Sequence, residues 1–241
     1  RHWLGNGCKS DTQRCYVVLR LSPTVQEKRQ QSRPPLNLSL ALDRSGSMGR
    51  EKMSRLQEAV VTLIDALSPR DYLAITIFND KASVILESQV VTDKKACQKK
   101  VSRLSAVGET AMSRGLEASL LQVAKHVEPG RLSRILLLTD GRTMNDEERC
   151  LELAAQAGQQ NVHVVALGLG DDWNRQLLLG VAERSQGRAE YVRDAEVIAQ
   201  AFTEEVHELQ TTLVHNIHVL GRLSAGVALH RAYRVVPRIE E

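Results

Sequence analysis

Two short apolar runs that each end at an aspartate limit the possible folds of this chain more than any other feature. Residues 36–42 and 134–139 are rich in Leu, Ile and Ala, and the residues that follow them are Asp43 and Asp140. Runs of this length and composition are typical of strands buried on both faces of a parallel sheet. Because the carboxyl ends of parallel strands lie at one edge of the sheet, both aspartates are expected at that edge.

The rest of the central region alternates strand and helix patterns, as a parallel sheet with crossover helices requires. In residues 51–67, for example, Met53, Leu56 and Val60 repeat at helical spacing. The pattern predicts an α/β fold with a Rossmann-like, doubly wound, mostly parallel six-stranded sheet and one antiparallel edge strand. Further strands are expected at 71–78, 82–86, 162–167 and 189–192, and helices at 51–67, 94–104, 112–127, 145–159, 173–184 and 194–209.

The two flanks follow a different pattern. Residues 16–21, 213–220 and 227–236 are β-branched or alternate between apolar and polar residues, without helix caps. We expect these segments to be strands that meet in a small β-sheet or sandwich beside the α/β body. The predicted division is therefore a flank at 1–35, a main domain at 36–210 and C-terminal strands at 211–241.

Charge is distributed unevenly along the 241 residues, although the net charge is only +3. Residues 1–36 carry seven basic and two acidic side chains, residues 211–241 carry four and two, and the centre carries 21 and 25. An acidic centre with basic flanks, and an aromatic content of 3%, argue against nucleic acid as a partner.

Targeting signals and cysteines give weaker expectations. No apolar run approaches the roughly 18 residues of a membrane helix, and no secretion signal is evident, so we expect no membrane insertion and a cytoplasmic location. Because the chain starts at Arg1 rather than Met, an extracellular location stays open. Cys8 and Cys15 are either two free thiols, which we favour, or a local disulfide.

Three segments distant in the sequence carry oxygen donors of one chemical kind. They are the run from Asp43 through Ser45 to Ser47, then Thr110, then Asp140. Carboxylates and hydroxyls are hard oxygen ligands that suit Mg²⁺, Mn²⁺ or Ca²⁺, whereas His and Cys favour zinc. We therefore expect a divalent cation, with Mg²⁺ as the first choice.

The predominance of neutral hydroxyls has a consequence for function. Mg²⁺ takes near-octahedral coordination, so these side chains and their waters leave a position free. A dication that the protein neutralises poorly attracts an anionic oxygen from outside, such as an Asp or Glu of a partner. The donor set therefore predicts a binding site rather than a catalytic one.

Each segment also has a simpler interpretation when it is taken alone. Ser47 can cap a helix after a strand-to-helix turn, Thr110 can cap the next helix, and Asp140 can begin a turn with Gly141. Other chemistries fit less well. An aspartyl phosphatase needs a second carboxylate where Ser45 stands, and no serine-hydrolase or nucleotide-binding motif is present.

The five positions together resemble the metal-ion-dependent adhesion site of von Willebrand factor type A (vWA) domains. That site has the pattern Asp-x-Ser-x-Ser, a distant Thr, and an Asp in a Thr-Asp-Gly setting, and the resemblance covers roughly residues 37–210. It implies hydroxyl ligands from Ser45, Ser47 and Thr110, with Asp43 and Asp140 near the metal. It also implies the β-rich flanks of bacterial members.

The resemblance implies a non-enzymatic, metal-dependent module that captures an acidic side chain of a protein partner. An alternative from another class is an accessory subunit of an AAA+ (MoxR-type) ATPase or metal-insertion machine. Hydrolysis of a phosphate ester at the cation is the least favoured hypothesis. Glu109 and Arg142, beside the expected ligands, are candidates for the rim of the binding surface.

Overall fold

A computed structural model describes residues 14–19, 34–143, 145–171, 173–211 and 221–231. Contacts within the chain define two units, residues 1–32 and 33–241, and the second contains all of the regular structure in the described ranges. In these ranges no helix combines the length and the apolar character that crossing a membrane requires.

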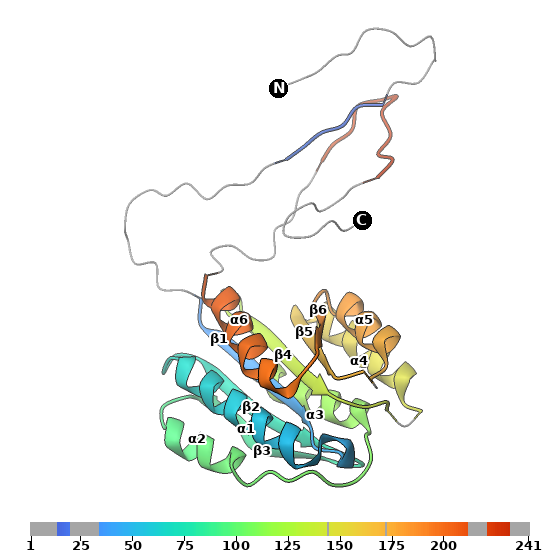
Figure 1. Ribbon diagram of the computed structural model, residues 1–241. Coiled ribbons are helices and arrows are strands. Elements are labelled where there is room, and N and C mark those ends of the chain that lie inside the picture. The colour runs from blue at the N-terminus through green and yellow to red at the C-terminus, as the bar shows by residue number, and fades with distance from the viewer. Residues whose placement is uncertain (1–13, 20–33, 144, 172, 212–220, 232–241) are drawn as a thin grey trace. The chain divides into compact units, whose positions relative to one another are not determined.

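The second unit is a six-stranded sheet covered by helices on both faces (Figure 1). Its strands are β1 (Leu36–Asp43), β2 (Tyr72–Phe78), β3 (Ala82–Val90), β4 (Leu132–Thr139), β5 (Val162–Leu169) and β6 (Arg188–Val192). Its helices are α1 (Gly49–Ala66), α2 (Lys94–Val101), α3 (Met112–Ala124), α4 (Glu147–Gln159), α5 (Arg175–Arg184) and α6 (Ile198–Thr211), with short 3₁₀ turns η1 (Gly46–Met48) and η2 (Ala195–Val197).

The strand order β3-β2-β1-β4-β5-β6 confirms the predicted doubly wound topology. All neighbouring strands are parallel except β2 and β3, which form the antiparallel edge hairpin. An Asx turn closes this hairpin, because the Asn79 side chain accepts a hydrogen bond from Lys81 N. Strands β2 and β3 lie on one side of β1, and the chain then returns to place β4 on its other side. The strand order therefore reverses between β1 and β4.

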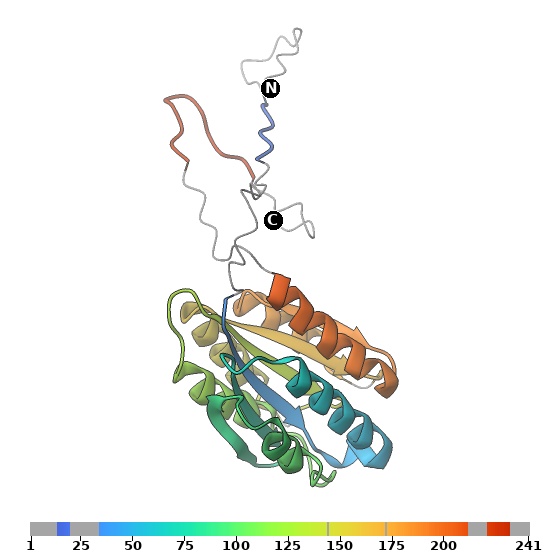
Figure 2. The same ribbon diagram turned by 90° about the vertical axis from the view of Figure 1, so that its left-hand side faces the viewer.

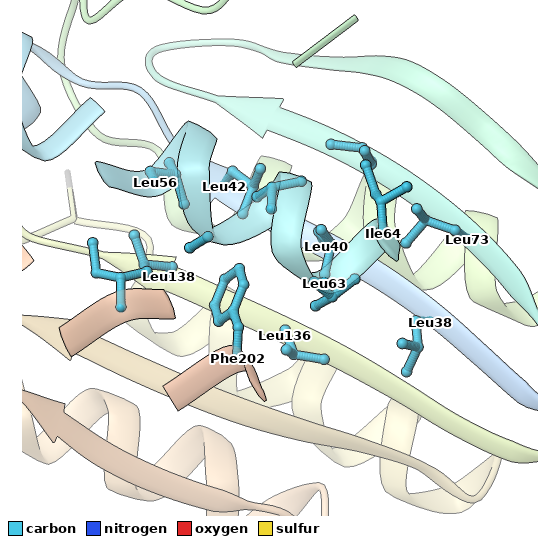
Figure 3. Packing of buried hydrophobic residues seen from close by; sticks show 14 of the residues in the cluster. Leu38, Leu40, Leu42, Leu56, Leu63, Ile64, Leu73, Leu136, Leu138 and Phe202 are labelled. Atoms are coloured by element: carbon cyan, nitrogen blue, oxygen red, sulfur yellow. The ribbon is translucent and has the colours of Figure 1, made fainter. Parts of the chain in front are cut away.

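One face of the sheet is covered by α1, α2 and α6 (Figure 2). Alternate residues of β1, Leu38, Leu40 and Leu42, point into this layer together with the apolar faces of the helices. Figure 3 shows the side chains of Leu63 from α1 and Phe202 from α6 in the same cluster. All five side chains are at most 1% exposed.

The other face is covered by α3, α4 and α5, and here α3 approaches the sheet closely. A Cβ added to Gly115 would lie 2.3 Å from Phe78 Cδ1, so only glycine allows this spacing. Asn37 of β1 donates hydrogen bonds to Val123 O of α3 (2.8 Å) and to Ser133 Oγ of β4 (3.0 Å). These hydrogen bonds hold the C-terminal end of α3 at the amino end of β1, and the contact of Gly115 with Phe78 holds its N-terminal half at the carboxyl end of β2.

Most differences from the sequence expectations are at element ends. Strand β3 continues to Val90 rather than ending at Leu86, because shifts of register against β2 break the alternation of its inward and outward side chains. Helices α2 and α3 end three residues early. Their chains tighten there into turns such as Leu104 N to Val101 O and His126 N to Val123 O.

The flanks contain no helix or strand in residues 14–19 and 221–231. Tyr16 and Val18 are exposed, and Val227 N closes a turn on Ser224 O. Extended segments without paired neighbours lack the hydrogen bonds that define a strand, so the strands expected at 16–19 and 227–231 are not formed there. The remainder of the three expected flank strands lies outside the described residues. The accessory sheet and the division at 1–35, 36–210 and 211–241 stay predictions.

Candidate metal-binding site

Asp43 and Asp140 lie at the point where the strand order reverses. Asp43 is the last residue of β1, and Asp140 directly follows the last residue of β4, its parallel neighbour. Ligand sites of open α/β sheets form at the carboxyl ends of strands on either side of such a reversal. Both aspartates are nearly inaccessible, at 0% and 1% exposure, so their charges require local partners.

Hydrogen bonds from two residues satisfy the Asp43 carboxylate. Its Oδ1 accepts from Ser45 N at 2.8 Å, and its Oδ2 accepts from Thr139 Oγ1 at 2.6 Å. Burial nevertheless raises the Asp43 pKa from 3.8 to about 6, because desolvation outweighs these hydrogen bonds, and the charge of Asp140 adds to the rise. The metal-free site therefore holds its negative charge at a free-energy cost.

A chain of polar contacts connects the two serines to Asp140. The Ser45 and Ser47 hydroxyl oxygens lie 3.0 Å apart, and Ser47 Oγ donates to Asp140 Oδ1 at 2.7 Å. The other carboxylate oxygen of Asp140 contacts Lys52 Nζ of α1 at 2.6 Å. Ser45 is buried and Ser47 is exposed, so the group opens to solvent at Ser47.

Backbone contacts with the loop after β1 place the segment that contains Thr110. Gly46 N donates to Gly108 O at 2.8 Å, and Val107 N donates to Arg44 O at 2.7 Å. Gly108 has a φ of +84°, and a Cβ there would lie 2.7 Å from Asp80 Oδ1. This position therefore requires glycine, and the turn it forms brings Thr110 beside the serines.

The loop after β4 caps α3 from another part of the chain. Met112 N donates to Thr143 Oγ1 at 3.0 Å, and Ser113 N donates to Asp146 Oδ2 at 2.8 Å. These contacts satisfy two backbone donors of the first turn of α3, which its own N-cap residue, Ala111, leaves unbonded. The Thr143 hydroxyl also donates to Asp146 Oδ1, and Thr110 O lies 3.3 Å from it. The Thr110 hydroxyl is therefore not needed as a helix cap.

Gly141 shows that Thr110 belongs to the same group. A Cβ on Gly141 would lie 3.4 Å from Thr110 Oγ1 and 3.6 Å from Ser47 Oγ, so both hydroxyls border the same small space. The structure thus brings together all the side chains that the sequence selected, from three loops at one edge of the sheet. Thr110 is buried, at 6% exposure.

A family model for the von Willebrand factor type A domain matches residues 37–205, a range that contains all of these side chains. The chain belongs to this family. An uncharacterized protein from Synechocystis is 34% identical to this vWA chain over 207 residues, which are 86% of the chain and 49% of that protein. Human inter-alpha-trypsin inhibitor heavy chain H3 is 27% identical over 191 residues, 71% of the chain and 21% of that protein. The vWA chain thus spans half or less of these relatives.

Solved structures agree with the vWA assignment. A von Willebrand factor type A protein from Catenulispora acidiphila superimposes with a TM-score of 0.64 at 26% identity, covering 74% of this chain and 43% of that one. Mussel proximal thread matrix protein 1, at 16% identity and a TM-score of 0.64, covers 74% and 46% and has been solved with zinc in its metal-ion-dependent adhesion site. Domains of this family generally mediate metal-dependent contacts between proteins.

The donor set of this vWA domain fits a hard divalent cation. Adjacent oxygens around an octahedral Mg²⁺, bonded at about 2.1 Å, are about 3 Å apart. The two serine hydroxyls are 3.0 Å apart, and because Ser47 donates its proton to Asp140 and Ser45 donates to Ser47, each oxygen keeps a lone pair for a cation. No group of three His, Cys, Asp or Glu side chains suited to a metal occurs in the described residues.

The simpler interpretations of the three segments disagree with the local geometry. The N-cap residue of α1 is Met48, and neither Ser45 nor Ser47 makes a side-chain cap hydrogen bond. The N-cap of α3 is Ala111 rather than Thr110. Only the turn after Asp140 is present as expected, with Gly141 buried behind it. Helix capping therefore does not explain the hydroxyls.

Sequence reasoning missed four residues that support this vWA site: Lys52, Thr139, Thr143 and Asp146. A signal existed for the last two, because Thr143 and Asp146 have the spacing of a capping box. That spacing does not reveal that the helix they cap is α3, which precedes them. Thr139 contacts Asp43 only because β1 and β4 are neighbours.

The surface beside the vWA site is polar and open. Glu109 and Arg142 are exposed, as expected for rim residues. A hollow of about 750 Å³ adjoins Thr110 and is lined by Asp80, Glu109, Ala111, Ser113, Arg114, Asn145, Asp146, Glu148, Arg149 and Glu152. Its lining includes neither Asp43 nor Asp140, so it is a neighbouring surface rather than the site itself.

Proposed function

We propose that this chain is a non-enzymatic protein-binding module that uses a divalent cation, most simply Mg²⁺, to capture an acidic side chain of a partner. Asp43, Ser45, Ser47, Thr110 and Asp140 would hold the cation. The observation that supports this most is the 3.0 Å separation of the Ser45 and Ser47 hydroxyls beside the buried Asp140. A bound cation supplies an open coordination position for an external carboxylate oxygen.

The roles of the side chains follow from their charges and contacts. Ser45, Ser47 and Thr110 offer neutral oxygens, which do not compensate the charge of the cation. Asp43 and Asp140 supply negative charge from the inner side, where Thr139 and Ser47 orient their carboxylates. The outer side, at the exposed Ser47, is where a partner's Asp or Glu would approach. The group contains no histidine base beside a hydroxyl, which is the usual arrangement of an activated serine.

Isothermal titration calorimetry with Mg²⁺ tests the proposal directly. The unmodified chain should bind one cation, and Asp43→Ala or Ser45→Ala should abolish the binding heat while circular dichroism shows an intact fold. Ser54→Ala is the matched control, because Ser54 is exposed on α1, outside the site. It should bind Mg²⁺ as the unmodified chain does.

Partner capture needs a separate measurement. Proteins retained on the immobilised chain in Mg²⁺ should be released by EDTA, and they should not bind the Asp43→Ala variant. A partner that stays bound in excess EDTA, and binds that variant equally well, would contradict capture through a cation.

The identity of the partner is a further part of the proposal. An AAA+ ATPase is the alternative that the resemblance to vWA domains suggests, with this chain as its accessory subunit. Co-purification of an ATPase, or stimulation of its turnover by the added chain, would support that role. A retained partner without ATPase activity would favour simple adhesion.

A further inference from the structure

Lys52 lies against one of the two carboxylates of the candidate site. Its Nζ is 2.6 Å from Asp140 Oδ2, and its side chain is 35% exposed while that of Asp140 is fully buried. The other Asp140 oxygen accepts the hydrogen bond from Ser47. The Asp140 carboxylate is thus shared between the ammonium group of Lys52 and the hydroxyl of Ser47.

This contact changes the charge that the protein presents to a metal ion. Asp43 and Asp140 carry two negative charges when both are ionised, and Lys52 cancels one of them. A dication then keeps a single positive charge after binding. Without Lys52, the two carboxylates would neutralise the dication completely, and little electrostatic attraction would remain for a ligand from outside. Charges on the exposed rim contribute less because solvent and salt screen them.

We infer that Lys52 sets this balance, weakening the metal affinity of the site and strengthening its affinity for an external carboxylate. The inference rests on the proposed function and adds a determinant of its ligand specificity. A loaded site with one positive charge matches one Asp or Glu side chain. Because the ammonium is bound to a buried carboxylate, its position is fixed, and its effect on the site is larger than that of a mobile surface charge.

Metal titration alone gives the first test. Lys52→Met removes the charge and keeps the helix propensity and most of the side-chain volume, so Mg²⁺ should bind about tenfold more tightly in calorimetry. Lys52→Arg retains the charge and should bind Mg²⁺ nearly as the unmodified chain does. Lys125→Met is the matched control, since Lys125 is a partly exposed lysine near the C-terminal end of α3 that pairs with Glu87. It should leave Mg²⁺ affinity unchanged.

The second measurement uses acetate as the smallest carboxylate probe. Acetate is titrated into the Mn²⁺-loaded protein, and the electron paramagnetic resonance signal of the bound Mn²⁺ reports the change in its ligands. Lys52→Met should bind acetate about tenfold more weakly than the unmodified chain. Opposite effects on metal and acetate are diagnostic, because a distorted site would bind both more weakly.

The possible outcomes separate this inference from the proposed function. If the unmodified chain binds no Mg²⁺ or Mn²⁺, the proposed function fails and the role of Lys52 fails with it. If it binds the metal and Lys52→Met binds metal no more tightly, or acetate no more weakly, only the inference about Lys52 is overturned. Unfolding in EDTA checks that the variant folds. If Lys52→Met does not fold, Lys52→Gln replaces it, because its amide can still donate to Asp140.

Discussion

Thr139 Oγ1 donates a 2.6 Å hydrogen bond to Asp43 Oδ2 and so joins the carboxyl ends of β4 and β1 at the candidate site. Both residues are fully buried. A hydrogen bond to a buried charged group contributes about 1.5–3 kcal/mol, more than a bond between neutral groups. Thr139 is therefore a positioning residue that keeps the Asp43 carboxylate ionised and oriented toward Ser45.

Replacing Thr139 by valine should weaken Mg²⁺ binding about tenfold at pH 7, a loss of about 1.4 kcal/mol. Valine has nearly the same shape and cannot donate to Asp43, so more of the binding free energy is spent on ionising that carboxylate. Calorimetric titration of the variant with Mg²⁺ measures the change.

Thr76→Val is the control for this substitution. Thr76 is also fully buried, in β2, but its hydroxyl has no hydrogen-bond partner in the part of the chain that the structure describes. Its replacement should leave Mg²⁺ affinity unchanged and should not destabilise the fold. Equal losses of affinity in both variants would mean that the threonine-to-valine exchange disturbs the sheet in general.

The raised pKa of Asp43 predicts how the metal-free protein responds to pH. Its pKa is about 6 in the folded chain against 3.8 as the ordinary value, so the folded state binds this proton more tightly than the unfolded state. The stability that this proton provides is complete below pH 4 and is lost as the pH rises through 6, a change of about 3 kcal/mol. In EDTA, chemical denaturation of Asp43→Asn should lack this loss.

Metal binding should show the opposite dependence on pH. Mg²⁺ requires the ionised Asp43, so its affinity should fall below pH 6, and binding near pH 6 should release a proton. The increase in melting temperature caused by Mg²⁺ should therefore be larger at pH 7 than at pH 5. An equal increase at both values would exclude Asp43 as a group whose ionisation controls metal binding.

The sequence was sufficient to predict the six-stranded sheet and the convergence of the five oxygen donors, because both depend on local patterns. The apolar runs of β1 and β4 and the aspartates at their ends are visible without any knowledge of distant contacts. Parallel strand packing then brings these ends together, which is why five side chains far apart in sequence converge as expected. The use of these side chains to bind metal stays a prediction.

The supporting residues could not be identified in the same way. Lys52 is one charged residue among several in the first turns of α1, and only the packing of that helix beside β4 gives it Asp140 as a partner. Asp146 precedes α4 but binds the backbone of α3. Residues 87–90 lack a clear strand pattern because β3 is the edge strand and most of these side chains are exposed.

A buried ion cluster at the other end of the strands provides a stability prediction. Glu205 of α6 is 2% exposed and pairs with Arg134 of β4 and Arg188 of β6, which are 20% and 23% exposed. Glu205→Gln removes the buried counter-charge of both guanidinium groups, although Arg188 still pairs with Glu190 and Glu208, so unfolding free energy should fall by about 1–3 kcal/mol. Denaturant titration measures this loss, and Mg²⁺ affinity should be unchanged.

The neighbouring Glu204→Gln is the control for this cluster. Glu204 is exposed on the same helix and pairs only with Gln200 among the described residues. Its replacement should change stability by less than about 0.5 kcal/mol. If both substitutions destabilise the chain equally, the effect arises from the charge of α6 rather than from the buried pairing.

Gly115 gives a prediction that links packing to the site. Alanine normally favours a helix by about 1 kcal/mol over glycine, but a Cβ here would meet the Phe78 ring at 2.3 Å. Gly115→Ala should therefore displace α3 and Thr110 from the sheet, lower stability by about 1–3 kcal/mol and weaken Mg²⁺ binding.

Gly180→Ala in α5 is the matched control, since its Cβ would meet only the flexible end of Leu151 at 2.8 Å. Denaturant titration measures the stability of both variants, and calorimetry measures their Mg²⁺ affinity. Unimpaired Mg²⁺ binding by a destabilised Gly115→Ala would show that the position of Thr110 does not depend on the close packing of α3.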